Sequence, residues 1–186
     1  MIYVSKEKKQ RIFIGIPIDK PGQRAIEKLL DPIKRHSRNL RWVPTGNRHL
    51  TLAFLGDMPG SDIYMLLGNL ASAYQQYKPF DYCLSALERF PNARGRIIAL
   101  TGEASAPLHS LVMTTRDMLR ECGLGYERNK FRPHVTLARI RNPKHPLTRI
   151  DRQARVDIKM DRIVLYRSTL TNTGSVYSVL QEVELK

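Results

Sequence analysis

Two short motifs of the chain place a threonine two positions after a histidine: HLTL at residues 49–52 and HVTL at residues 134–137. On a β-strand, residues i and i+2 point to the same side, so each motif presents an imidazole and a hydroxyl together. Two imidazoles, whose ordinary pKa is about 6.5, suit a proton donor and acceptor at neutral pH. Two hydroxyls suit the oxygens of a phosphate. The motifs therefore predict acid–base chemistry at a phosphorus centre.

The two motifs end a segment that occurs twice. Arg11 precedes His49 by 38 residues, and Arg96 precedes His134 by the same 38 residues. Each segment begins with Arg-Ile and a strand pattern, continues through a helix pattern and a basic extended stretch, and ends in His-x-Thr-Leu-Ala. We expect two similar lobes related by a pseudo-twofold axis, with the two motif strands meeting at one central groove.

Hydrophobic periodicity predicts an α+β fold in which each lobe is an antiparallel sheet backed by helices, around a central cleft. We expect a charged tail over residues 1–10 and a single bilobal domain over residues 11–186. Helices are expected after Asp19 and Ser61, which can cap them, and from Pro107 onward, each with an apolar stripe. Strands are expected over residues 11–18, 40–43, 49–56, 80–90, 96–101, 134–140, 161–170 and 175–185, and a loop over residues 141–155.

The composition favours a polyanionic partner. The 186 residues carry a formal net charge of +14, which attracts nucleic acid, and 42% apolar residues are enough for a core. No apolar run approaches the ~20 residues of a membrane span, and the N-terminus lacks the apolar stretch of a secretory signal. Two cysteines without a CxxC pair indicate a reducing cytoplasm. We therefore expect a cytoplasmic monomer that does not bind membranes.

Three stretches of the chain resemble the RNA 2′,3′-cyclic phosphodiesterases, also called 2′-5′ RNA ligases, of the two-histidine phosphoesterase superfamily. They are HLTLAFLG at residues 49–56, FRPHVTLAR at residues 131–139 and IVLYRSTLTNTGSVYSVL at residues 163–180. The resemblance implies hydrolysis of RNA 2′,3′-cyclic phosphate ends to 2′-phosphates. It makes His49 the proton donor and His134 the proton acceptor, although pseudo-symmetry alone supports either direction. Reversal of the step would give 2′-5′ ligation.

Thr51 and Thr136 are expected to hold the phosphate, and four further side chains are candidates for substrate binding. Lys130 and Arg132 share the parity of His134, so an extended approach would make them a cationic funnel for RNA; a solvated basic strand is the alternative. Arg139 matches the arginine after the second motif in the family and suits a phosphate clamp. Strict alternation sends Arg139 to the opposite face, however, so this role requires a β-bulge or the end of the strand.

Phe13 lies on the face opposite a row of alternating isoleucines. It either stacks a terminal base in the groove or is covered by a helix. No HExxH motif, Cys–His set or carboxylate cluster accompanies the motif histidines, and the chain lacks phosphate-binding loops of the Walker and GxGxxG types. We therefore expect neither a metal nor a cofactor.

Two other functions remain open at this point. A non-catalytic module that binds single-stranded RNA would show salt-dependent affinity and would tolerate substitution of both histidines. A phosphodiesterase for 2′-5′ oligoadenylate would use the same chemistry on another substrate. Histidine and threonine at identical strand positions are poor residues for affinity alone at neutral pH, so the repeated motif favours an enzyme.

Overall fold

The computed structural model describes residues 9–35, 37–127, 130–142, 150, 152–172 and 174–186. The helices within these ranges are α1 (Lys20–Lys34), α2 (Gly60–Tyr74) and α3 (Ala106–Glu121), with a 3₁₀ turn at Thr45–Asn47. The strands are β1 (Gln10–Pro17), β2 (Leu40–Trp42), β3 (His49–Met58), β4 (Phe80–Phe90), β5 (Ile97–Thr101), β6 (His134–Ile140), β7 (Arg152–Met160), β8 (Arg162–Thr171) and β9 (Gly174–Glu184).

The nine strands of the described chain form one antiparallel sheet. Its order is β7-β4-β5-β6-β3-β1-β8-β9, with β2 paired to β6 beside this path. At the centre, β3 pairs with β6 through Leu50 and Val135. Going outward from this pair, β5, β4 and β7 follow β6 in the same way that β1, β8 and β9 follow β3. The predicted pseudo-twofold relation is confirmed, with the two halves sharing a continuous sheet.

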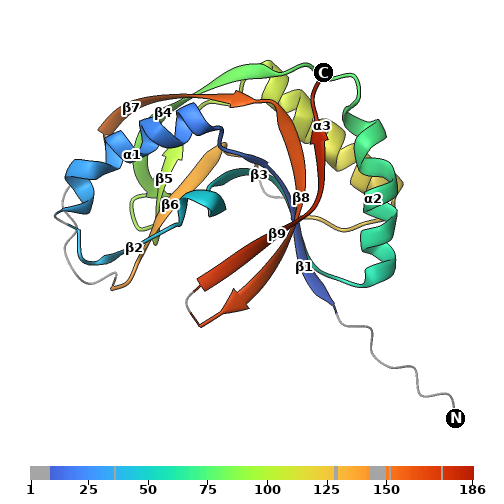
Figure 1. Ribbon diagram of the computed structural model, residues 1–186, viewed down its shortest axis with the longest axis horizontal. Helices are drawn as coiled ribbons and strands as arrows, with labels where there is room; N and C mark the ends of the chain where they lie inside the picture. The colour runs from blue at the N-terminus through green and yellow to red at the C-terminus, as the bar shows by residue number, and fades with distance from the viewer. Residues whose placement is uncertain (1–8, 36, 128–129, 143–149, 151, 173) are drawn as a thin grey trace, which may run out of the picture.

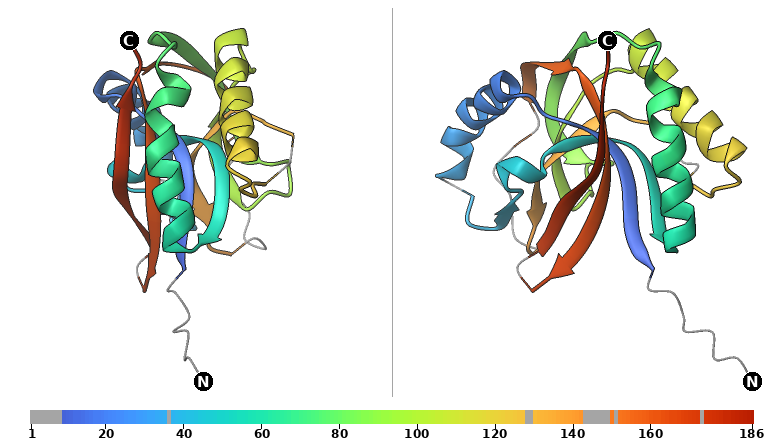
Figure 2. Two further views of the ribbon diagram at one scale, coloured as in Figure 1. Left: turned by 90° about the vertical axis from the view of Figure 1, so that its right-hand side faces the viewer. Right: turned by 45° about the vertical axis from the view of Figure 1, so that its right-hand side comes forward.

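The helices cover one face of this sheet, and the main core lies between them and the strands. Helix α1 packs on β7, whereas α2 and α3 lie side by side and contact β9 and β3 (Figures 1 and 2). Helix α1 follows β1 in sequence but covers the half of the sheet that contains β7. In the same way, α3 follows β5 but contacts β3 in the other half. The strand residues Ile14, Leu50 and Val135 are fully buried in this core, so the opposite side of the central strands is left for polar groups.

Local sequence signals account for most helix ends. The Asp19 carboxylate accepts a hydrogen bond from the Gly22 amide at the start of α1, at 3.2 Å, and Ser105 Oγ accepts one from Leu108 in α3. The expectation that Ser61 caps α2 is wrong, because the helix begins one residue earlier and no side chain caps it. Asp62 in its first turn complements the helix dipole instead.

The expected loop over residues 141–155 is wrong in its last part. Strand β7 begins at Arg152 and pairs along β4, and its residues Val156, Ile158 and Met160 alternate into the core. The first four residues of the strand, RQAR at 152–155, lack this period of two and therefore resemble a loop in the sequence. The expected N-terminal tail lies outside the described residues up to position 8, and Gln10 already belongs to β1.

Candidate active site

A groove of about 1260 Å³ runs across the sheet face opposite the main core, and both histidine–threonine motifs line it. Because β3 and β6 are antiparallel and Leu50 faces Val135, His49 stands opposite Thr136 and Thr51 opposite His134. Cross-strand neighbours are about 5 Å apart and alternate strand residues about 6.6 Å apart. The two imidazoles therefore occupy opposite corners of a rectangle about 8 Å across, with a hydroxyl at each remaining corner. This spacing suits one phosphorus centre.

Each imidazole is oriented by a backbone carbonyl two residues before it. His49 Nδ1 lies 2.8 Å from the carbonyl oxygen of Asn47, and His134 Nδ1 lies 2.9 Å from that of Arg132. A carbonyl oxygen can only accept, so Nδ1 carries the proton in both rings. Nε2 is then the atom that can gain or lose a proton, and among the described residues neither Nε2 has a hydrogen-bond partner. The two rings can thus exchange protons with a ligand in the groove.

Three aromatic rings surround His49. The ring of Phe13 is centred 4.7 Å from the imidazole, that of Tyr177 5.3 Å and that of Tyr166 5.8 Å. Burial lowers the pKa of His49 from 6.5 to about 4; the hydrogen bond to Asn47 opposes this shift, and the charge of His134 adds to it. Burial also raises the pKa of Tyr166 to about 12. His49 is therefore neutral in the free protein near pH 7.

His134 has a different environment. Its imidazole stacks on Phe90 at the end of β4, with ring centroids 4.0 Å apart. Arg132 lies over the same phenyl ring at 4.9 Å, and it binds the carboxylate of Glu88 at 3.2 Å and the carbonyl of Pro91. Burial lowers the pKa of His134, the hydrogen bond to the Arg132 carbonyl opposes this, and the Arg132 charge adds to it. Phe90 and Arg132 thus act as a support for the second imidazole.

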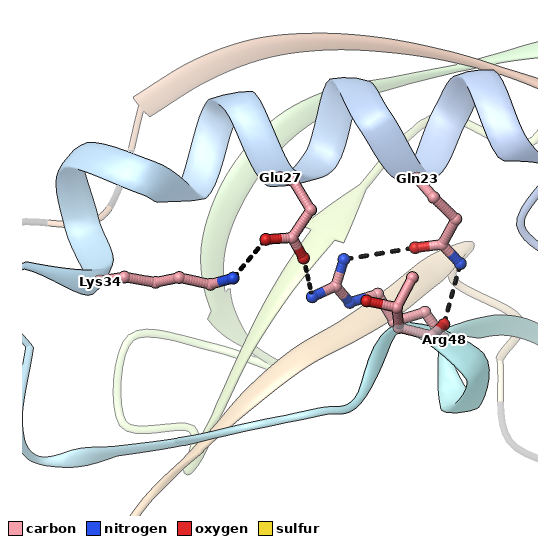
Figure 3. Close-up of polar contacts among 5 residues, drawn as sticks. Gln23, Glu27, Lys34 and Arg48 are labelled. Atoms are coloured by element: carbon pink, nitrogen blue, oxygen red, sulfur yellow. Dashed lines mark hydrogen bonds and ion pairs between the residues drawn. The ribbon is translucent and has the colours of Figure 1, made fainter.

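A cluster of charged side chains fixes the start of β3, next to His49. Arg48 is buried, with 3% of its surface exposed. Its guanidinium donates to Glu27 Oε1 at 2.5 Å and to Gln23 Oε1 at 3.3 Å (Figure 3). Lys34 binds the other carboxylate oxygen of Glu27. These contacts join α1 to the residue that precedes the first imidazole, so the cluster positions His49 without touching the groove.

The bulge required for Arg139 is present. On β5, Ala99 pairs with Thr136 and its neighbour Ile98 pairs with Ala138. Leu137 is therefore an extra residue on β6. Arg139 is thereby returned to the side of the histidine, where it is exposed and lines the groove. The same bulge occurs in β3 at Leu52, and there it brings out Phe54, which is 43% exposed and also lines the groove.

Three of the predicted binding residues do not behave as expected. Lys130 is exposed but does not line the groove, and Arg132 does not line it either. The parity argument failed because β6 begins only at His134, so the preceding residues do not alternate as a strand. Phe13 lines the groove but is 2% exposed, with its ring stacked on Tyr166 at 4.8 Å and beside His49. It cannot offer a free face to a base and instead encloses the imidazole.

Sequence reasoning missed several exposed residues of the groove, among them Arg41 and Phe54. Overlaying the two motifs would have identified Phe54, because it follows His49 by the five positions that separate Arg139 from His134. Arg41 had no such signal, since its position depends on the pairing of β2 with β6. In the described part of the chain, no three His, Cys, Asp or Glu side chains form a group that could hold a metal ion, and no helix is long and apolar enough to cross a membrane.

Known proteins resemble this chain in sequence and in fold. A family model described as the 2′-5′ RNA ligase superfamily matches residues 19–172. An RNA 2′,3′-cyclic phosphodiesterase of Thermotoga maritima is 26% identical over 180 residues, which cover 95% of this chain and 96% of that protein. The crystal structure of TT0787 of Thermus thermophilus aligns with a TM-score of 0.82 at 24% identity, covering 94% of this chain and 97% of its own. Escherichia coli LigT aligns at 0.77 with 22% identity, covering 97% and 99%. These structures share the fold described above.

Proposed function

This chain belongs to the 2′-5′ RNA ligase superfamily, and we propose that it is an RNA 2′,3′-cyclic phosphodiesterase that forms 2′-phosphate ends. The register of β3 and β6 carries the proposal, because it places two imidazoles and two hydroxyls around one position in the groove. The match to the Thermotoga maritima phosphodiesterase, which extends over nearly the whole of both chains, supports the same activity. One chain supplies all four groups, so the reaction needs no partner subunit.

The proposed hydrolysis divides the work between the two motifs. Water attacks the phosphorus of the cyclic phosphate while His134 Nε2 accepts a water proton. The bond from phosphorus to the 3′-oxygen breaks, and protonated His49 donates its Nε2 proton to that oxygen. Thr51 and Thr136 hold the non-bridging oxygens through their hydroxyls. The product carries a 2′-phosphate and a free 3′-hydroxyl, and the proton passes back from His134 to His49 through solvent. Acid and base each contribute about 10² to 10⁴ in rate.

The substrate itself supplies the charge that this step requires. The cyclic phosphate carries one negative charge, and its position between the rings favours the protonated form of either imidazole. Binding therefore raises the pKa of His49 from its low value in the free protein and makes it a proton donor. Ligation is the same step with a 5′-hydroxyl in place of water. Its attack expels the 3′-oxygen and leaves a 2′-5′ linkage.

The test is hydrolysis of adenosine 2′,3′-cyclic phosphate with EDTA present, followed by identification of the product. We expect adenosine 2′-phosphate, and loss of about 10² or more in kcat for His49→Ala and for His134→Ala. His109→Ala is the matched control, because His109 is exposed on α3 and does not line the groove. A 3′-phosphate product would show that the 2′-oxygen leaves instead of the 3′-oxygen. Full activity of both motif variants would refute the roles given to the two histidines, and no turnover by the wild-type protein would leave a module that only binds RNA.

A further inference from the structure

Two arginines face each other across neighbouring strands at one side of the histidine–threonine rectangle. Arg41 on β2 and Arg139 on β6 are direct register partners, so their side chains project to the same face of the sheet. Both are exposed and both line the groove. Among the described residues, neither forms an ion pair with a carboxylate. Like charges directly opposite each other repel and cost stability, so an anion between them would stabilise the pair.

The arginine pair lies beside one particular row of the rectangle. Strands β2 and β3 both pair with the same edge of β6, β2 at residues 138–140 and β3 at Val135 (Figure 1). The row formed by His49 and Thr136 is therefore the one next to the arginines, whereas the row of Thr51 and His134 lies farther away. Because Leu137 is bulged, Arg139 lies opposite Ile97 and Thr136 opposite Ala99, so the two are separated by two strand steps, about 7 Å. A phosphate between the imidazoles leaves room for a second anion at the arginines.

The chemistry of ribose determines which anion this is. In a terminal nucleotide with a 2′,3′-cyclic phosphate, the 3′-carbon adjoins the 4′-carbon, which leads through the 5′-carbon to the next phosphodiester. The 2′-carbon adjoins the 1′-carbon, which carries the base. With the 3′-oxygen directed at His49, the upstream phosphodiester extends from the His49 side of the rectangle, where Arg41 and Arg139 lie. Asp57 and Asp62 line the groove elsewhere and would repel the same phosphate.

We propose that Arg41 and Arg139 bind the phosphodiester that joins the terminal nucleotide to its 5′ neighbour, so that the protein selects oligonucleotide ends over cyclic mononucleotides. This inference rests on the proposed function and on the direction in which the 3′-oxygen leaves. Guanidinium groups bind phosphate oxygens through paired, charge-assisted hydrogen bonds. A cyclic mononucleotide has no upstream phosphodiester and gains nothing from the pair.

The experiment compares kcat/KM for two substrates: adenosine 2′,3′-cyclic phosphate, and the dinucleotide ApA with a 2′,3′-cyclic phosphate end. The variants are Arg41→Ala, Arg41→Lys and, as a matched control, Arg24→Ala, which removes an exposed arginine of α1 that does not line the groove. We expect the wild-type protein to prefer the dinucleotide. Arg41→Ala should lower the ratio of dinucleotide to mononucleotide kcat/KM by about tenfold or more, Arg41→Lys by less, and Arg24→Ala not at all.

Salt dependence provides a second readout. The slope of log kcat/KM against log salt for the dinucleotide should become shallower by about 0.7 in Arg41→Ala, because one phosphate contact is lost. An unchanged substrate ratio in Arg41→Ala, or a wild-type preference for the mononucleotide, would overturn the inference and leave the proposed phosphodiesterase activity standing. No wild-type turnover of either substrate would instead refute that activity, and this inference with it.

Discussion

Protonation of His49 should make the stability of the protein depend on pH over a defined range. Burial among three aromatic rings lowers the pKa of His49 from 6.5 to about 4, so the unfolded chain takes up this proton before the folded one. The part of the free energy of unfolding that depends on neutral His49 is complete above about pH 6.5. It is lost progressively as the pH falls from about 6.5 to about 4. A difference of about 2.5 between the two pKa values corresponds to about 3 kcal/mol. Protonation of one side chain would thus cost much of the stability of an ordinary domain.

The measurement is urea unfolding of the wild-type protein and of His49→Gln at several pH values between 7.5 and 4. Titration of His134 and of the carboxylates is common to both proteins and cancels in the difference between them. We expect this difference to change by about 3 kcal/mol over the range, with a slope of at most about 1.4 kcal/mol per pH unit, in favour of the wild type at high pH. A difference independent of pH would refute the argument that the aromatic rings desolvate His49.

Three further predictions follow from the site. Because the pKa values of both imidazoles are lowered in the free protein, kcat/KM should peak below pH 6.5 and kcat at a higher pH; coincident optima would contradict this. Glu27→Gln should lower the free energy of unfolding by about 3 kcal/mol, because it leaves the buried guanidinium of Arg48 without its countercharge; urea unfolding should show at least half of this restored by adding Arg48→Met. A Cβ at Gly15 would lie 3.2 Å from the His49 ring and 3.0 Å from a backbone oxygen, so Gly15→Ala should reduce kcat about 10²-fold, whereas Gly68→Ala, which meets nothing within 4 Å, should not.

The parts of the molecule with strong local patterns could be predicted from the sequence. The strands over residues 80–90 and 134–140 have the predicted bounds, because their periods are regular and their ends carry turn residues. The duplication predicted the central meeting of the motif strands, since equal spacing in two copies implies equal placement. The start of strand β7 was missed because residues 152–155 continue a basic stretch and show no apolar period of two; the alternating residues begin only at Val156.

The candidate site was predictable only where it depends on side-chain alternation within one strand. Both motifs satisfy this condition. Arg139 does not, because a bulge at Leu137 changes the parity, and a bulge depends on the partner strand. Arg41 depends on a pairing with a strand almost 100 residues away. Phe13 was placed on the correct face, but its burial depends on Tyr166 and Tyr177 from a distant hairpin.

The paired bulges at Leu52 and Leu137 have a consequence for the direction of the reaction. A ligand turned end for end would meet the same imidazoles and hydroxyls, so the rectangle alone does not distinguish the oxygen that leaves from the one that attacks. The two bulges are at equivalent positions, but one brings the ring of Phe54 to the groove and the other brings the guanidinium of Arg139. These two different side chains therefore break the pseudo-twofold symmetry of the site. They favour one orientation of an RNA strand in the groove over the opposite one.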